Sequence, residues 1–127
     1  MELTAIDPET SPRPTGGYVN ALQVQGASRL LFVSGQIPEN RDGRVPDGIE
    51  EQCRLVWANL TAALFAAEME ITNLVKVTTF LADREHAAAN TIVRNEVLGH
   101  HRPALTVIVA GIFEPGWLVE IEAIAAS

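Results

Sequence analysis

The segment from Trp117 to Ala125 constrains the fold most, because its pattern is that of a strand with one fully apolar side. Its odd positions are all apolar. Its even positions are occupied by Leu118, Glu120, Glu122 and Ile124. Alternate residues of a strand face opposite sides of a sheet. One side therefore belongs in a core, and the other side places two carboxylates between large apolar residues.

Two helices are expected elsewhere. Asp47 is a good N-cap, and Glu50 three residues later completes a capping-box pattern. Apolar residues then recur at helical spacing from Ile49 to about residue 67. Asp83 predicts the start of a second helix, and Gly99 predicts its end.

The remaining apolar runs predict strands over residues 18–24, 29–34, 74–81 and 105–110, with a hairpin joining the first two. Pro8, Pro12, Pro14 and Gly16 predict an irregular N-terminal arm over residues 1–16. A chain of 127 residues has the length of a single domain, so residues 1–127 are expected to form one unit. The predicted order, β-β-α-β-α-β-β, indicates an α+β fold.

The same pattern predicts an oligomer. Two helices can cover only one face of such a sheet. The segment from Leu105 to Ala110 is apolar at its odd and its even positions apart from Thr106, as is typical of strands buried on both faces. We therefore expect the uncovered face to be buried against another subunit.

Composition argues against several classes of protein. The formal net charge of −7 and the lack of a basic run argue against nucleic-acid binding. The lone Cys53 fits a reducing compartment and is expected to be a buried thiol on the first helix. There is no visible signal sequence and no apolar run of ~20 residues, so we expect a cytoplasmic protein without a membrane span. His100 and His101 have no third ligand at a metal-like spacing, so no metal is expected.

Several residues are candidates for chemistry. Glu120 and Glu122 lie on one side of a strand, roughly 7 Å apart, and could orient or deprotonate water. Alternatively, they mark a solvated polar side. Gly35, after Ser34 at a strand end, would let a backbone N–H approach a ligand, or it is an ordinary turn glycine.

Two further candidates are polar residues that could face a ligand. The hydroxyl of Tyr18 could form a hydrogen bond with a ligand, although such a tyrosine often serves in packing. Asn90 lies among alanines of the second helix and needs a polar partner, either backbone or ligand.

Taken together, several segments resemble the RidA/YjgF family of reactive-intermediate deaminases, from about Tyr18 to Ala125. The segments are Ser34-Gly35-Gln36-Ile37-Pro38, residues 75–83, Asn90, Pro103-Ala104 and residues 119–125. The resemblance implies a chorismate-mutase-like α+β fold. It also implies a homotrimer with a central β-barrel and sites in the clefts between subunits. Family members hydrolyse enamines and imines such as 2-aminoacrylate to ammonia and a 2-keto acid, without a metal or organic cofactor.

The resemblance also implies roles for individual residues. Glu120 would hold the attacking water. The substrate pocket would be lined by Tyr18, Ser34, Gly35 and Asn90, with Leu105 and Thr106 beside them.

This sequence departs from the family at one of these positions. The family arginine that binds the substrate carboxylate follows Pro-Ala, and Leu105 stands there. Leucine cannot form the bidentate bond of a guanidinium with a carboxylate. This predicts no acceleration of 2-aminoacrylate deamination over buffer, and a substrate that is uncharged or less acidic at that end. Arg102 lies three residues upstream, ~10 Å away and on the other face, so it is not expected to compensate.

The alternative to an imine or enamine hydrolase is a non-catalytic trimer that senses or sequesters a small metabolite in the same clefts. Nucleic-acid cleavage, a label sometimes attached to this family, is disfavoured by the net charge.

Overall fold

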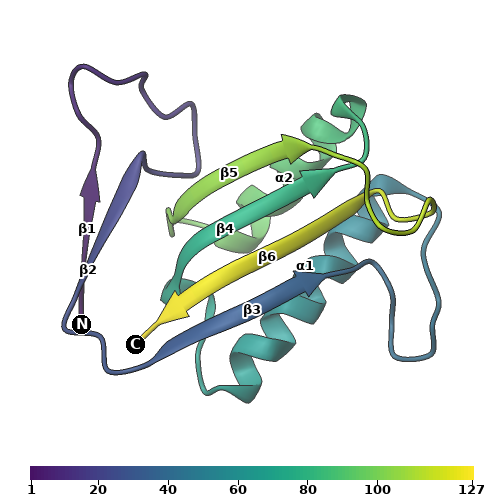
Figure 1. Ribbon diagram of the computed structural model, residues 1–127, viewed down its shortest axis with the longest axis horizontal. Helices are drawn as coiled ribbons and strands as arrows, with labels where there is room; N and C mark the ends of the chain where they lie inside the picture. Colours follow the sequence, from purple (N-terminus) through teal and green to yellow (C-terminus); the bar gives the residue numbers. More distant parts are fainter.

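A computed structural model describes all residues, 1–127, and has a four-stranded sheet with two helices on one face (Figure 1). The strands lie in the order β3 (Leu30–Gln36), β6 (Val119–Ala126), β4 (Leu74–Leu81) and β5 (Ala104–Val109). β4 and β5 are parallel, and the other neighbours are antiparallel. The predicted α+β fold, with both helices on one face, is confirmed, and the sheet is mixed.

The helices are α1 (Ile49–Ala66) and α2 (Ala87–Leu98), and short 3-10 turns η1 (Ile71–Asn73) and η2 (Arg84–His86) flank β4. The core lies between the helices and the sheet. Its largest fully buried apolar side chains are Trp57, Leu60, Leu64, Leu74, Leu81, Ile121, Val56, Val77, Val93 and Val119. The odd-numbered residues of β6 face this core, as the alternation predicted. No helix in the structure combines the length and apolar character that crossing a membrane requires.

The helix boundaries correct one prediction and support two others. The N-cap of α1 is Gly48 rather than Asp47, because Gly48 is extended (φ −93°, ψ 151°) and its carbonyl accepts the first helical bond, from Gln52 N–H at 3.0 Å. Asp83 accepts a bond from Glu85 N–H at 2.9 Å and so caps η2, which leads into α2. Gly99, with φ of 58°, ends α2.

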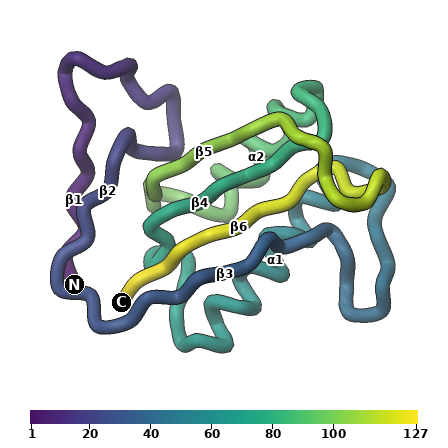
Figure 2. Tube along the Cα trace, in the orientation of Figure 1, coloured from purple at the N-terminus to yellow at the C-terminus, as the bar shows by residue number.

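The N-terminal region differs from the prediction in two ways. Residues 18–24 do not form a hairpin with residues 29–34. Instead β2 (Ala21–Gln25) pairs with β1 (Glu2–Ile6), so the start of the arm is a strand rather than irregular. This hairpin lies apart from the four-stranded sheet, as the trace in Figure 2 shows. The pairing of β2 with β1 sets apolar Leu3 opposite apolar Val24. β3 is not available to β2, because it pairs with the buried strand β6.

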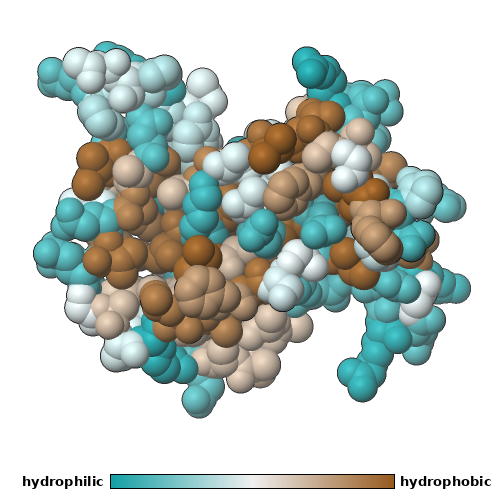
Figure 3. Space-filling model, viewed as in Figure 1, coloured by the Kyte–Doolittle hydropathy of each residue, from teal (hydrophilic) through white to brown (hydrophobic).

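The sheet face opposite the helices carries large apolar side chains at its surface. Leu30 and Phe32 of β3 are 61% and 71% exposed, and Ile108 of β5 is 44% exposed. Figure 3 looks onto this face and shows hydrophobic surface over β3 and over the end of β5. The chain alone leaves this face uncovered, so only one side of the sheet is buried within one copy.

Candidate functional site

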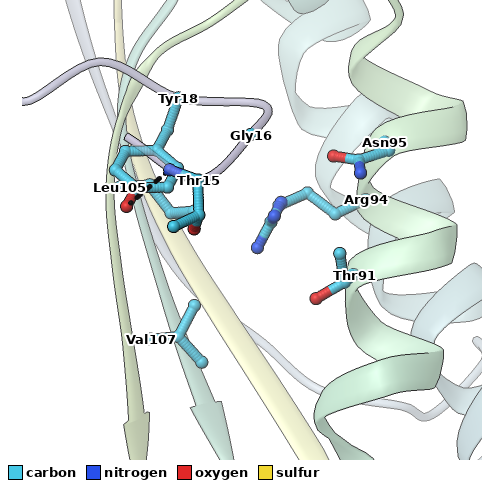
Figure 4. A pocket seen from close by; sticks show the side chains of 8 residues that line it. All are labelled: Thr15, Gly16, Tyr18, Thr91, Arg94, Asn95, Leu105 and Val107. Atoms are coloured by element: carbon cyan, nitrogen blue, oxygen red, sulfur yellow. Dashed lines mark hydrogen bonds between the residues drawn. The ribbon is translucent and has the colours of Figure 1, made fainter. Parts of the chain in front are cut away.

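A cavity of about 340 Å³ lies between α2, β5 and the loop before β2 (Figure 4). It brings together residues that are far apart in the sequence. Its eight lining residues are Thr15, Gly16, Tyr18, Thr91, Arg94, Asn95, Leu105 and Val107. Two of the predicted site residues, Tyr18 and Leu105, therefore meet in one cavity.

The alternation of side chains along β5 determines which two of its residues line the cavity. Leu105 and Val107 point to the helix side of the sheet, because Thr106 between them points to the opposite side. The loop is tied beside them by Val19, whose N–H donates to the carbonyl of Pro103 at 3.3 Å. This tether places Tyr18, the preceding residue, against β5.

Gly17 allows the same loop to approach α2 closely. Its φ of 71° lies in the left-handed region, and a side-chain carbon there would come within 2.5 Å of Asn95 Oδ1. The positive φ and the close approach to Asn95 both favour a glycine where the loop meets the helix.

Tyr18 presents its hydroxyl to the cavity rim. The hydroxyl accepts a hydrogen bond from Thr15 N–H at 3.4 Å. Contacts with Thr15 first, and then the positive charge of Arg94, lower the pKa of the Tyr18 phenol. The hydroxyl keeps its own proton available for donation to a ligand.

Arg94 is the charged residue among the lining residues that the sequence interpretation missed. It is only 5% exposed, and its side chain extends from α2 into the cavity, facing the wall that holds Leu105 and Val107 (Figure 4). Burial lowers the pKa of its guanidinium, but an arginine stays charged at neutral pH. The signal was its position four residues after Asn90, which puts both side chains on one helix face.

A second group of predicted residues lies on the other side of the sheet. Glu120 is on β6, half-buried, with its side chain on the face that the helices leave open. It packs against Gly35, where an added side-chain carbon would lie 2.8 Å from the Glu120 Cδ. A β-bulge in β3 between Val33 and Gln36 accompanies this approach. Glu122, two residues on, is exposed.

The remaining candidates lie outside the cavity. Ser34 is exposed beside Gly35, and its carbonyl accepts a bond from Gln36 Nε2 at 2.8 Å. Thr106 accepts a bond from Lys76 Nζ at 2.7 Å on the open face. Asn90 is 1% exposed and does not line the cavity, and its Oδ1 has no hydrogen-bond partner.

The structure thus forms two half-sites: Tyr18 with Leu105, and Gly35 with Glu120. Leu105 is in register with Val77, whereas Glu120 is in register with Phe80. Three residues along the strand and two strands across separate them by roughly 14 Å, on opposite faces. A small ligand cannot touch both half-sites of one copy.

Two other titratable residues considered above, Cys53 and His101, lie among residues of the fold and outside the cavity. Cys53 is fully buried, as expected, and burial raises the pKa of its thiol to about 11. His101 Nε2 lies 2.6 Å from the carbonyl of Leu74. No group of three or more His, Cys, Asp or Glu side chains is arranged to hold a metal ion.

Comparison with known proteins connects this architecture to a family. The family profile described as endoribonuclease L-PSP matches residues 8–127. A RutC family protein of Pyrococcus horikoshii is 35% identical over 119 residues, covering 92% of each chain. The Rid family protein YyfB from Yersinia pestis superposes with a TM-score of 0.85 at 26% identity over the whole of both chains. Escherichia coli TdcF with bound serine superposes with a TM-score of 0.73 at 27% identity over 98% of both chains. The chain therefore belongs to the RidA/YjgF family.

Proposed function

We propose that this protein hydrolyses the C=N bond of small imines or enamines in clefts formed between copies of the chain. The observation that carries the proposal is the place of Glu120, a half-buried carboxylate set against Gly35 on a sheet face with apolar neighbours. The family supports the reaction class, since the relative TdcF of Escherichia coli is described as a candidate reactive intermediate deaminase.

In this mechanism Glu120 accepts a proton from a bound water while the oxygen of that water attacks the C=N carbon. The attack forms a carbinolamine. The proton on Glu120 passes to the nitrogen, and Glu120 then transfers the remaining proton of the former water from the carbinolamine hydroxyl to the nitrogen as well. The C–N bond breaks, and a carbonyl compound and ammonia leave. The reaction consumes one water, and this balance needs no oxidant or cofactor.

The shared cleft follows from the separation of the two half-sites. A ligand that reaches Glu120 and also the cavity of Tyr18 and Leu105 must lie between two copies. We propose that a homotrimer, the assembly implied by the family resemblance, provides this juxtaposition. Burial of the exposed Phe32 and Leu30 on the open sheet face would stabilise it.

The experiment uses imines made in the reaction mixture. An amino-acid oxidase supplies imines with a carboxylate, and an amine oxidase supplies imines without one. Semicarbazide competes with hydrolysis by trapping the imine, so a hydrolase lowers the trapped fraction. We expect the protein to lower the trapped fraction of at least one class. The Glu120→Gln variant should match buffer, and the Glu122→Gln variant should retain most of the activity.

A non-catalytic binder is the second candidate, and the relative TdcF is recorded with serine bound. A wild-type protein that leaves the trapped fraction of both imine classes at the buffer value would favour this binder. A Glu120→Gln variant as active as the wild type would instead refute the role of Glu120.

A further inference from the structure

We propose that Arg94 is the anion-binding residue of the cavity, and that it holds the carboxylate of a small ligand whose apolar chain lies along Leu105 and Val107. This deepens the proposed function by naming the charged end of the substrate. The binding step itself can be measured without turnover.

The first argument is that Arg94 has no partner within the chain. Its side chain is buried, and its Nε has no hydrogen-bond partner. Both ion pairs of the protein belong to Arg54, so no carboxylate lies within 4 Å of Arg94. A buried charge without a counter-charge costs several kcal/mol, so a buried arginine normally has an acidic or anionic partner.

The second argument is the chemistry of the cavity. None of its eight lining residues is acidic. Besides Arg94, its polar side chains are the hydroxyls of Thr15, Tyr18 and Thr91 and the amide of Asn95. All of these can donate a hydrogen bond to an anion. The cavity therefore favours a ligand that is negative where it meets α2.

The third argument favours an organic carboxylate over an inorganic anion such as phosphate. The guanidinium fork matches a carboxylate through two parallel N–H bonds. The opposite wall is apolar, through Leu105 and Val107, and the cavity of about 340 Å³ exceeds the needs of an inorganic ion. A short carbon chain attached to the carboxylate would cover this wall, whereas phosphate would leave it unfilled.

The position of Arg94 also changes the meaning of Leu105. From Leu105 alone, a substrate that is uncharged or less acidic at that end is expected. Arg94 delivers a guanidinium to the same cavity from α2 instead of from β5 (Figure 4). The charge is thus relocated rather than lost, and Leu105 provides apolar contact beside it.

The test is an NMR titration of the assembled protein that follows the Nε–Hε signal of Arg94. The probes are propionate, its neutral isostere propionamide, and inorganic phosphate. Propionate should shift the signal to saturation, and propionamide and phosphate should bind at least tenfold more weakly. Equal affinity for propionate and propionamide, an unmoved Arg94 signal, or phosphate binding as tight as propionate would each overturn the proposal.

Variants supply a second readout. Arg94→Leu should weaken propionate binding at least tenfold, Arg94→Lys should weaken it less, and Leu105→Arg in the Arg94→Leu background should restore part of it. Arg94 could instead pair with a carboxylate of a neighbouring copy. In that case Arg94→Leu would dissociate the oligomer while the wild type bound no propionate, and the proposal would be wrong. A protein that binds propionate through Arg94 but hydrolyses no imine would refute the proposed reaction and leave this inference standing.

Discussion

The carboxylate of Glu120 occupies the space that a side chain at Gly35 would need. The two residues come from neighbouring strands, β3 and β6, at the bulge that interrupts their pairing. Because Gly35 has no side chain, the carboxylate of Glu120 can lie against its backbone.

A methyl group at Gly35 should therefore displace Glu120 without disturbing the core. We expect Gly35→Ala to lower imine hydrolysis at least tenfold, because a shift of about 1 Å at a reacting group can cost that much. Gly111→Ala is the matched control, since nothing lies within 4 Å of its added carbon and its φ is not positive. Equal activity of the two variants would show that the position of Glu120 does not matter.

The open sheet face should be the surface that joins the copies. Replacing Phe32 with Asp places a charge on this face, at the edge strand β3, and we expect sedimentation to change from a trimer to smaller species. Phe65→Asp on α1 is the control, because Phe65 is 81% exposed against 71% for Phe32 but lies on the opposite side of the molecule. Dissociation by the Phe65 variant alone would place the interface on the helices instead.

Gln52 should stabilise the fold by connecting α1 to two loops. Its buried amide donates to the carbonyls of Pro46 and Gly116 at 2.8 and 3.0 Å, and its Oε1 accepts from Leu118 N–H at 2.8 Å. Gln52→Leu leaves three backbone groups unpaired. We expect the free energy of unfolding to fall by about 2–4 kcal/mol in urea denaturation at fixed protein concentration. Gln23→Leu, at an exposed position of β2, should change it little.

Cys53 should make stability depend on alkaline pH. Burial raises the pKa of its thiol from 9.0 to about 11, so the folded state retains a proton that the unfolded state loses. Its contribution is complete below about pH 9 and is lost as the pH rises towards 11, by up to about 2–3 kcal/mol.

The Cys53→Ala variant isolates this contribution of Cys53. Its free energy of unfolding should fall less steeply between pH 9 and pH 11 than that of the wild type. Parallel curves for the two proteins would contradict the assignment.

Most of the fold can be predicted from the periodicity of apolar residues in the sequence. Apolar spacing defined α1, α2, β4, β5 and β6, because burial of one helix stripe and one strand side is a local property of the sequence. The pairing of β1 with β2 was not readable, since strand partners are chosen by tertiary contacts. The cap of α1 was misplaced by one residue because Asp47 and Gly48 are both acceptable N-caps.

The site was readable only in part, for a similar reason. Glu120 and Gly35 could be selected by type and position, but their contact depends on the register of β3 against β6. Arg94 looked like an ordinary helix cation. Only the packing of the loop around Gly17 against α2 shows that its guanidinium is enclosed.

The most direct test of the shared site mixes two variants that are each inactive. Glu120→Gln removes the carboxylate half-site, and Leu105→Glu closes the cavity half-site by pairing with Arg94. Copies of the two are unfolded, mixed in equal amounts and reassembled, and mass spectrometry of tagged chains verifies that mixed oligomers form. If each site combines halves from two copies, about a quarter of the sites receive two intact halves, and about a quarter of wild-type imine hydrolysis should return. Mixed oligomers that remain inactive would contradict a site shared between copies.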